Sequence, residues 1–459
     1  MTRIVIIGAG PTGLGAAYRL QEIGHEDWAI YERNDHVGGL ASSYTDDKGF
    51  TYDTGGHVLF SHYKYFDELV DRLLGDNFSS IQREAWIWMM GRFLPYPFQN
   101  NIRHLPKEDV VACLNGLIAA QRDRRDSSTF EEWINATFGE GIARLFMLPY
   151  NFKVWATPLH LMSKQWMAER VSVVDTERVL RNVLLERDDL SWGPNNTFKY
   201  PLRGGTGAIY QAFLPFVESK LHFGKAALAV DLVRKVVEFA DGTSTNYDVL
   251  LSTIPLDQLI GWSRGAPAEV HEASRQLVHN SSYIVGVGIA RPAPTSKCWI
   301  YFPESSAPFY RVTYLSNYSP HMTPDANHHL LLTETSHSPW KPEAGDDIVA
   351  RVIDGLIATG LLEEADRSRI AATYRIDVPY EYPVPTVGRD AALAVIQPFL
   401  MARDVYSRGR FGAWQYEIGN MDHSVMQGVE FVNTVLLGGK EETWKPASPS
   451  LSPALARAS

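Results

Sequence analysis

The chain has 459 residues, of which 45% are hydrophobic and 21% charged, the composition of an ordinary globular protein with two or three domains. Its 53 Asp and Glu residues outnumber its 43 Lys and Arg residues, so the net charge is −10. Because no basic excess exists to displace the counterions of a phosphate backbone, this balance argues against a nucleic-acid partner.

Cysteine content and the length of apolar runs indicate the expected compartment. The chain has two cysteines, Cys113 and Cys298, so we expect no disulfide framework, which suits a reducing cytoplasm. No apolar run approaches the roughly 20 residues that a membrane helix needs. Because the N-terminus leads directly into a first strand, we expect no signal peptide, no membrane partner and a cytoplasmic location.

The first 32 residues have the organisation of a dinucleotide-binding unit. Residues 3–7 form an apolar, β-branched run typical of a buried parallel strand, and a second strand is expected at 28–31. A Gly-x-Gly-x-x-Gly motif and helix-forming residues lie between the two strands, and an acid follows the second strand. The motif residues are Gly8, Gly10, Gly13 and Glu32.

Each residue of this motif has a physical role in holding a dinucleotide. We expect Gly8 to allow a tight turn and Gly10 to let the backbone approach a pyrophosphate. Gly13 lets the helix pack closely on the strand, and Glu32 can accept a hydrogen bond from the adenosine ribose. The helix N-terminus adds free N–H groups and a positive dipole end. The alternative is a glycine turn with a structural role alone.

A second glycine pair favours flavin over nicotinamide as the resident cofactor. Gly38 and Gly39 lie just after the ribose acid, in the segment 33–41, and bring the backbone close to the cofactor again. This pattern resembles the flavoprotein superfamily that includes amine oxidases, phytoene desaturases and UDP-galactopyranose mutases. The resemblance implies FAD as the cofactor, with Arg33, Gly39 and Leu40 among its contacts.

Three later segments add candidate ligand contacts. Gly55 and Gly56 precede His57, and a histidine beside a glycine pair in a flavin domain is a functional candidate. The glycine-rich loop at 201–207 precedes a helix and is expected to re-enter the flavin domain. A last strand, a glycine turn and a helix N-terminus cover 406–424, which in a doubly wound fold places N–H groups at the flavin.

We therefore predict an α/β protein: a discontinuous Rossmann-like FAD-binding domain, an inserted helical domain and an antiparallel β-sheet substrate domain. The FAD-binding domain is expected to comprise 1–85, 203–265 and 386–440. The helical domain, with the substrate flap, is expected at 100–190, and the β-sheet domain at 86–99, 191–202 and 280–385. Residues 443–459 are rich in Pro, Ser and Ala and are expected to be a disordered tail.

Short segments in order along nearly the whole chain resemble one family more closely, the flavin-dependent UDP-galactopyranose mutases, in particular their eukaryotic-type branch. The matching segments are GGHVLFSHYKYFD, PYPFQNNI, PYNFKVWA, AERV, WGPN, PLRGGTGAI, CWIYFP, PFYR, SNYSP, YPVPT and SRGRFGAWQYEIGNMDHS. The resemblance implies an isomerase that interconverts UDP-galactopyranose and UDP-galactofuranose without net redox change. In that family the N5 atom of reduced FAD attacks the anomeric carbon, UDP leaves, and the ring opens and recloses through a flavin iminium.

The resemblance also assigns roles to residues. Arg170 and Arg311 resemble the pair that grips the pyrophosphate, and His57 the histidine beside the flavin, so these and the flap residue Asn195 are the catalytic candidates. The remaining flavin contacts implied are Gly56, Arg410, Asn420, Met421 and Ser424. The substrate contacts implied are Tyr96, Phe98, Gln99, Phe146, Asn151, Trp155, Arg170, Asn195, Trp299, Tyr301, Arg311, Tyr382 and Tyr416.

Other interpretations stay open at this point. One is a mutase for another nucleotide pyranose, since contacts to the sugar hydroxyls are not readable from the sequence. Another is a flavin amine oxidase or desaturase, which would need an apolar substrate tunnel. A third is a flavin-binding scaffold without catalysis. We expect NADPH or NADH as the reductant, a UDP-sugar substrate and no metal, and we allow for a homo-oligomer.

Overall fold

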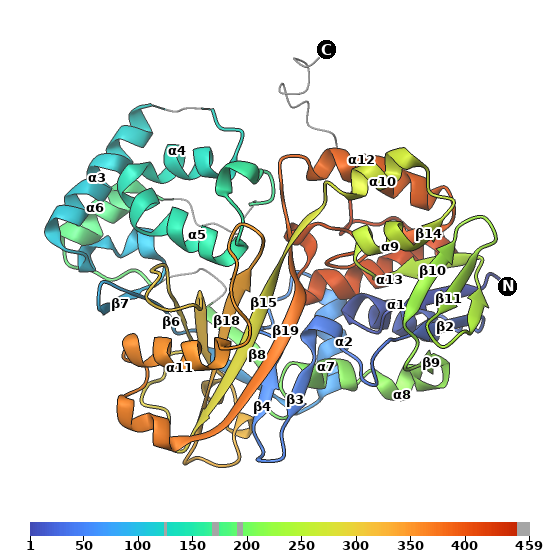
Figure 1. The fold of residues 1–459 in the computed structure, drawn as a ribbon, viewed down its shortest axis with the longest axis horizontal. Coiled ribbons are helices and arrows are strands. Elements are labelled where there is room, and N and C mark those ends of the chain that lie inside the picture. The colour runs from blue at the N-terminus through green and yellow to red at the C-terminus, as the bar shows by residue number, and fades with distance from the viewer. Residues whose placement is uncertain (124–125, 168–173, 191–195, 448–459) are drawn as a thin grey trace.

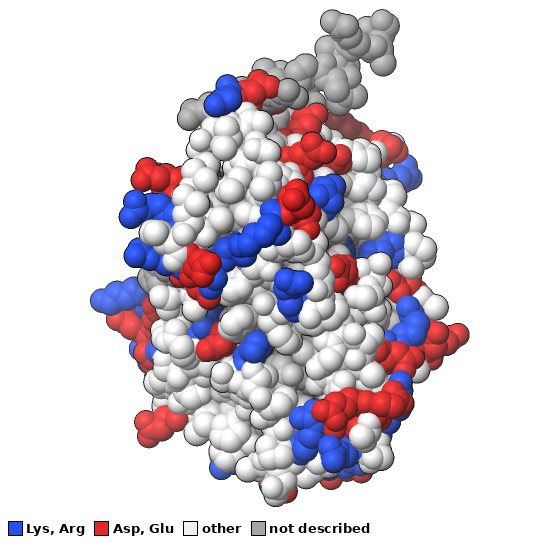
Figure 2. Space-filling model, turned by 90° about the vertical axis from the view of Figure 1, so that its left-hand side faces the viewer, with Lys and Arg blue, Asp and Glu red and all other residues white. Residues whose placement is uncertain are grey.

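A computed structural model of the chain describes residues 1–123, 126–167, 174–190 and 196–447. Arg170 and Asn195, two of the expected catalytic residues, lie outside the described residues. Among the helices within these ranges, none is both long and apolar enough to cross a bilayer. Acidic and basic side chains are interspersed among uncharged residues on the face shown in Figure 2.

A five-stranded parallel sheet forms the base of the dinucleotide-binding part (Figure 1). Its strand order is β20-β13-β1-β2-β9. The bounds are β1 (Ile4–Ile7), β2 (Trp28–Tyr31), β9 (Leu221–His222), β13 (Val249–Ser252) and β20 (Val405–Ser407). The short apolar runs of the sequence are thus buried parallel strands, which confirms the Rossmann-like expectation.

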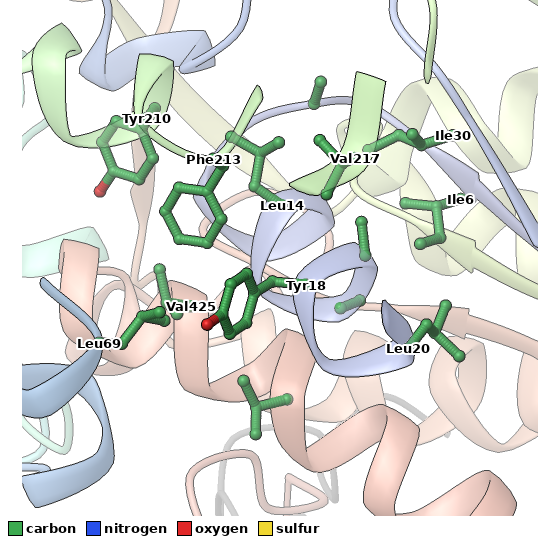
Figure 3. Close-up of a cluster of buried hydrophobic side chains, with 14 of the residues drawn as sticks. Ile6, Leu14, Tyr18, Leu20, Ile30, Leu69, Tyr210, Phe213, Val217 and Val425 are labelled. Atoms are coloured by element: carbon green, nitrogen blue, oxygen red, sulfur yellow. The ribbon is translucent and has the colours of Figure 1, made fainter. Parts of the chain in front are cut away.

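Two helices from opposite ends of the chain pack together on this sheet. They are α1 (Pro11–Glu22) and α13 (Met421–Leu437). Figure 3 shows the core that they share with the sheet and with the loop-and-helix segment around Phe213. Leu14, Tyr18 and Val425 contribute to it, and the Tyr18 and Phe213 rings meet edge to face at 5.7 Å. The C-terminal helix therefore completes the N-terminal dinucleotide-binding unit.

A second layer flanks the other face of the parallel sheet. Its four-stranded sheet has the order β12-β11-β10-β14. The bounds are β10 (Ala227–Asp231), β11 (Val236–Phe239), β12 (Ser244–Asn246), β14 (Ser263–Arg264), α9 (Leu256–Trp262), α10 (Ala268–Ser274) and α12 (Arg389–Met401). These elements share one buried core with Val5 and Leu250 of the parallel sheet.

A seven-stranded sheet forms the substrate side, in the order β19-β15-β18-β17-β16-β6-β7. Neighbouring strands are antiparallel except β16 and β6. The bounds are β6 (Ala85–Met89), β7 (Arg92–Pro95), β15 (Val278–Ile289), β16 (Trp299–Tyr301), β17 (Arg311–Tyr314), β18 (His329–His337) and β19 (Ile370–Val384), with α11 (Ile348–Ala358) packed on one face. The long strands β15 and β19 run between the two halves of the molecule (Figure 1).

The helical insertion lies at one end of this sheet, beside the long strands β15 and β19 (Figure 1). Its helices are α3 (Lys107–Arg122), α4 (Phe130–Ile142), α5 (Leu148–Trp155) and α6 (Thr176–Leu184). A capping box begins α4, since the side chain of Thr129 accepts from the backbone of Glu132 and the Glu132 carboxylate accepts from the backbone of Thr129.

The remaining elements connect these layers. They are β3 (Ser43–Thr45), β4 (Thr51–Asp53), β5 (Phe78–Gln82), β8 (Thr197–Pro201), α2 (Lys64–Leu74), α7 (Gly207–Gln211) and α8 (Leu214–Val217). Strand β8 pairs with β5, so the segment expected in the substrate sheet instead joins a strand of the expected FAD-binding part. The exact division into domains stays a proposal.

The expected start of the disordered tail, at residue 443, is wrong. Thr443 and Trp444 are buried, and the backbone N–H of Thr443 donates to the Glu430 carboxylate at 2.8 Å. The Trp444 ring lies 3.6 Å from the guanidinium carbon of Arg408, and Glu441 forms a buried ion pair with the same arginine. The chain up to Ala447 is therefore packed against the flavin-binding part.

Candidate active site

A cavity of about 1080 Å³ opens along the carboxyl edge of the parallel sheet. It is lined by the first two glycines of the fingerprint, by the ribose acid and by residues from the segments 33–41, 55–57 and 406–424. The expected cofactor residues that line it are Gly8, Gly10, Glu32, Arg33, Gly39, Leu40, His57, Arg410, Met421 and Ser424. Its lining residues come from β1, β2, β19 and α13, so segments far apart in the sequence surround one ligand-sized space.

Gly10 shows that this cavity suits a group that approaches the backbone. Gly10 is the N-cap of α1, and no side chain caps the first turn, so backbone N–H groups remain available for a phosphate. A β-carbon on Gly10 would meet no atom closer than 3.9 Å, the Cα of Gly39, so it would protrude into the ligand space. A β-carbon on Gly13 would instead lie 1.9 Å from the carbonyl oxygen of Gly8. Gly13 thus serves helix–strand packing, and it does not line the cavity.

The ribose acid is held in a fixed orientation by backbone donors. One oxygen of Glu32 accepts from the N–H of Ala9 at 2.8 Å, and the other accepts from the N–H of Asn34 at 2.9 Å. The carboxylate still lines the cavity, and each of its oxygens has a second lone pair for a hydroxyl. The residues present therefore fit an adenine dinucleotide at this edge.

A smaller cavity of about 200 Å³ continues from the larger one, and the two share His57, Arg410 and Met421 as lining residues. Gly56 and Asn420, expected at the flavin, line this smaller cavity. So do Arg311, Tyr382 and Tyr416, expected at the substrate. The structure therefore brings the expected flavin and substrate residues to one junction.

Arg311 is the cation of this junction that is most firmly held. Its Nη2 donates to Glu334 at 2.6 Å and its Nε donates to the other oxygen of the same carboxylate, which is buried. Among the described residues, none accepts a hydrogen bond from Nη1. Gly56 packs against this arginine, since a β-carbon there would lie 3.3 Å from Nη2. The bidentate pair aims Arg311 and leaves one edge of the guanidinium for an anion.

His57 and Arg410 lie where the two cavities meet. The Nε of Arg410 donates to the carbonyl of Gly419 at 3.0 Å, and its Nη1 donates to the carbonyl of Glu381 at 3.3 Å. Burial, with further contributions from Arg410 and Arg311, lowers the pKa of His57 to about 4. His57 is therefore neutral at physiological pH, whereas Arg410 is a cation held by backbone carbonyls.

Glu381 is the second acid of the smaller cavity. Its Oε1 accepts from the hydroxyl of Tyr310 at 2.7 Å, whereas its Oε2 is buried without a hydrogen-bond partner. Burial, together with the nearby Glu334, raises the pKa of Glu381 to about 8. Near neutral pH the charges of Arg311 and Glu334 cancel, Glu381 is protonated, and Arg410 leaves the junction with a net positive charge.

An aromatic wall extends from this junction into the helical insertion. Tyr382 and Tyr416 meet at 5.4 Å, and the Trp155 ring of α5 lies 4.8 Å from Tyr416. Further contacts join Tyr96 to Tyr301 at 4.9 Å and Tyr301 to Tyr150 at 5.3 Å. The wall therefore reaches from the smaller cavity to α5 and the loop before α3.

Some expected substrate residues are packed inside this wall rather than lining either cavity. Phe98 stacks on Phe146 at 4.7 Å, and both are buried. The amide of Asn151 donates to the carbonyl of Met147, one turn earlier in its helix. Gln99 and Trp299 are buried beside the same wall. Their contact with a substrate stays a prediction.

Sequence reasoning missed four residues: Glu334, Glu381, Tyr310 and Tyr150. Tyr150 stacks with Phe146 at 5.1 Å and belongs to the aromatic wall. The two acids, Glu334 and Glu381, belong to no recognisable motif. Glu334 is brought to Arg311 by the pairing of β17 with β18, and Glu381 is positioned by the pairing of β15 with β19. An available signal was the adjacency of Glu381 to Tyr382, and of Tyr310 to Arg311, two residues that we had already selected.

Comparison with known proteins identifies the class first. The family model described as flavin containing amine oxidoreductase matches residues 11–372, and the chain belongs to this family. A 15-cis-phytoene desaturase of Synechococcus elongatus is 34% identical over 146 residues, 30% of this chain and 28% of the relative. The chain thus matches less than a third of that curated relative's length. A putative protoporphyrinogen oxidase from Exiguobacterium shares the fold, with 18% identity and a TM-score of 0.73 over 95% of this chain and 99% of the other.

The particular branch follows from a closer structural likeness. The crystal structure of a reduced UDP-galactopyranose mutase is 45% identical, with a TM-score of 0.93, over 98% of this chain and 97% of the other. This likeness extends through the sheet, the helical insertion and the flavin-binding part together. Within the flavin family the chain is therefore placed with the UDP-galactopyranose mutases.

Proposed function

We propose that this protein is an isomerase that interconverts UDP-galactopyranose and UDP-galactofuranose with FAD as its cofactor. The observation that carries the proposal is the continuity of the dinucleotide cavity with a small, positively charged cavity lined by Arg311, Arg410 and His57. The whole-length likeness to a reduced UDP-galactopyranose mutase supports the same reaction.

The larger cavity would hold the FAD. The N-terminus of α1 and Gly10 would receive its pyrophosphate, Glu32 its ribose, and His57, Arg410 and Met421 would lie at the flavin ring. When bound and reduced, FAD supplies at N5 a nucleophile for the anomeric carbon of the sugar. Arg410, whose hydrogen bonds go to backbone carbonyls, would stabilise the negative charge of a reduced flavin.

Arg311 would bind the diphosphate of the substrate. UDP gains negative charge as it leaves the anomeric carbon, so a fixed guanidinium stabilises the transition state more than the ground state. Glu334 holds that guanidinium in place through two hydrogen bonds, and Tyr382 and Tyr416 lie close enough in the same cavity to add hydroxyl donors. We propose the same anion-binding role for Arg170 and a nucleotide contact for Asn195.

The aromatic wall would form the uridine side of the site. Tyr96, Tyr150 and Tyr301 form a run of rings whose faces and edges suit a planar base. Trp155 belongs to the same hydrophobic cluster as these rings and contacts Tyr382 and Tyr416, the tyrosines proposed to bind the phosphates. Because the charges lie at one end and the rings at the other, the wall would orient the nucleotide with its diphosphate toward the flavin.

The flavin must be reduced before the reaction, and we propose NADPH or NADH as the reductant, used once for many turnovers. We also place the enzyme in the cytoplasm, since Cys113 and Cys298 are both buried free thiols. A nucleic-acid partner is not proposed, and a homo-oligomer stays open.

A panel of nucleotide sugars tests the specificity. The FAD-loaded protein, reduced with dithionite, is incubated with UDP-galactopyranose, UDP-arabinopyranose and UDP-glucuronate, and the products are separated by chromatography. We expect conversion of UDP-galactopyranose at the highest rate. Conversion of another sugar at a higher rate would replace the proposed substrate, and stoichiometric consumption of reductant would contradict an isomerase.

A further inference from the structure

Two acids line a cavity that is proposed to receive an anionic substrate, and only one of them has a cation as its partner. Glu334 is neutralised by Arg311 through two hydrogen bonds. Glu381 faces the same cavity, and its described side-chain partner is the hydroxyl of Tyr310, a neutral group. An ionised Glu381 would cancel the positive charge that Arg410 leaves at the junction.

The backbone of β19 explains why Glu381 reaches the cavity at all. Consecutive residues of a strand normally point to opposite faces, yet Glu381 and Tyr382 both line the smaller cavity. Between the paired positions Asn280–Tyr382 and Ser282–Val378, three residues of β19 lie opposite one residue of β15. Glu381 is the last residue of this bulge, and the bulge re-aims its side chain so that the acid and the following tyrosine share one side.

The hydrogen bonding of Glu381 is incomplete without a ligand. Its Oε1 accepts from Tyr310, but its Oε2 is buried and makes no hydrogen bond. A buried carboxyl oxygen without a partner is costly, and a carboxylic acid that carries its proton there is a donor that needs an acceptor. Glu381 lines the smaller cavity, so a ligand there supplies that acceptor once the buried Oε2 turns toward it.

We propose that Glu381 enters the reaction as a neutral carboxylic acid and donates a hydrogen bond from Oε2 to an oxygen of the sugar ring or its hydroxyls. The inference deepens the proposed function and rests on it, because it assigns the sugar to the smaller cavity. Glu381 would thereby distinguish a nucleotide sugar, which offers neutral oxygens at this point, from the free nucleotide, which does not.

The groups that face Glu381 determine its protonation. Tyr310, beside β17, donates to it and so lowers its pKa, as do the cations Arg311 of β17 and Arg410 of the loop before α13. Glu334 of β18 raises that pKa, and burial raises it most. Tyr382 on the same strand and His57 on the opposite loop complete the lining. The balance keeps the acid protonated below about pH 8.

The test compares two ligands across pH. Dissociation constants of UDP and UDP-galactose are measured on the FAD-loaded, reduced protein between pH 6.5 and 9.5. The ratio of the two constants gives the contribution of the sugar to binding, which we call the preference for UDP-galactose. In the unaltered protein we expect the preference for UDP-galactose to fall about three- to ten-fold as pH rises through 8, the worth of one hydrogen bond.

Variants separate the effect of the Glu381 proton from that of the size of the side chain. Glu381→Gln keeps a donor that does not titrate, so its preference should be constant with pH. Glu381→Leu should show the low preference at every pH, with UDP binding unchanged. Tyr310→Phe keeps the acid but removes the hydroxyl that favours its ionisation, so the midpoint should move to higher pH. Glu364→Gln, an exposed substitution far from the cavity, is the control.

The outcomes that contradict the inference are distinct from failure of the proposed function. A preference that does not change with pH in the unaltered protein, or that still titrates in Glu381→Gln, would overturn it. So would a changed flavin reduction potential in Glu381→Gln with an unchanged sugar preference, since the carboxyl would then face the flavin. If UDP itself does not bind the unaltered protein, the proposed function fails first.

Discussion

We expect anion binding to depend most on Arg311, which its partner Glu334 holds in place. Arg311→Ala should retain FAD but lose about 2–4 kcal/mol of transition-state stabilisation, roughly 30- to 1,000-fold in kcat/KM. The same change leaves Glu334 buried and unpaired, which costs stability in addition.

The double variant Arg311→Ala/Glu334→Gln separates the two effects. It should recover much of the lost stability, measured by thermal unfolding, without recovering turnover. If turnover returns together with stability, the role of Arg311 is structural and the assignment to the diphosphate is wrong.

The burial of His57 predicts how the stability of the protein depends on pH. Its pKa is lowered to about 4 from an ordinary value near 6.5, so the unfolded chain takes up a proton before the native protein does. The stability that neutral His57 contributes is present above about pH 6.5 and is lost as pH falls toward 4. His57→Gln should flatten that part of the stability curve, and NMR of the imidazole should show a midpoint near 4. A midpoint near 6.5 would contradict the buried, cation-flanked setting.

At the scale of elements, the fingerprint helix offers a matched pair of glycines. Gly10→Val should fold and lose FAD, because the added atoms enter the cavity, as the 3.9 Å to the nearest atom indicates. Gly13→Val should lower stability as well, because its β-carbon would lie 1.9 Å from the Gly8 carbonyl oxygen. Bound flavin absorbance and the unfolding temperature distinguish the two. Unchanged FAD content in Gly10→Val would remove the pyrophosphate from the N-terminus of α1.

One buried amide links the helical insertion to two strands of the substrate sheet. Asn280 donates to the carbonyl of Val154, at the end of α5, and accepts from the N–H of Tyr382 on β19. Asn280→Ala should cost about 1–3 kcal/mol in unfolding free energy and raise the KM for the nucleotide sugar. The control is Ser281→Ala, next to Asn280 on β15, which removes a partly exposed hydrogen bond to the carbonyl of Pro379 on β19. Equal effects of both changes would contradict a special role for this joint.

The elements that could be predicted were those with local signals. The strand–glycine–helix unit depends on neighbouring residues, and it is confirmed. Local signals mislead at 380–384, where the neighbouring prolines favour a constrained loop although these residues belong to β19. Pro379 and Pro383 are tolerated there because β19 is an edge strand of its sheet with a bulge.

The candidate site was predictable where a family motif covers it and not elsewhere. Gly56, His57, Arg311 and Arg410 were selected from segments that match the family, and they line connected cavities. Glu334 and Glu381 were missed because their positions depend on strand pairing between distant segments and on a bulge. Such long-range geometry leaves no periodic signal in the chain.

At the scale of the whole molecule, the C-terminal segment closes the flavin-binding part. Arg408 is fully buried, pairs with Glu441 and is covered by Trp444, and it directly precedes the Gly409–Arg410 turn that lines the larger cavity. Glu441→Ala leaves a buried cation unpaired, so we expect a loss of about 3–5 kcal/mol in stability and weaker FAD retention. The neighbouring exposed change Glu442→Ala should have little effect. Equal unfolding temperatures for the two variants would show that the segment is dispensable.

The proposed reaction needs a reduced flavin and consumes no reductant. The most direct measurement takes one FAD-loaded sample, divides it, reduces one half with dithionite and incubates both halves with UDP-galactofuranose. We expect UDP-galactopyranose from the reduced half alone, in many-fold excess over the flavin present. Conversion by the oxidised half, or none by a reduced half that binds UDP, would contradict it.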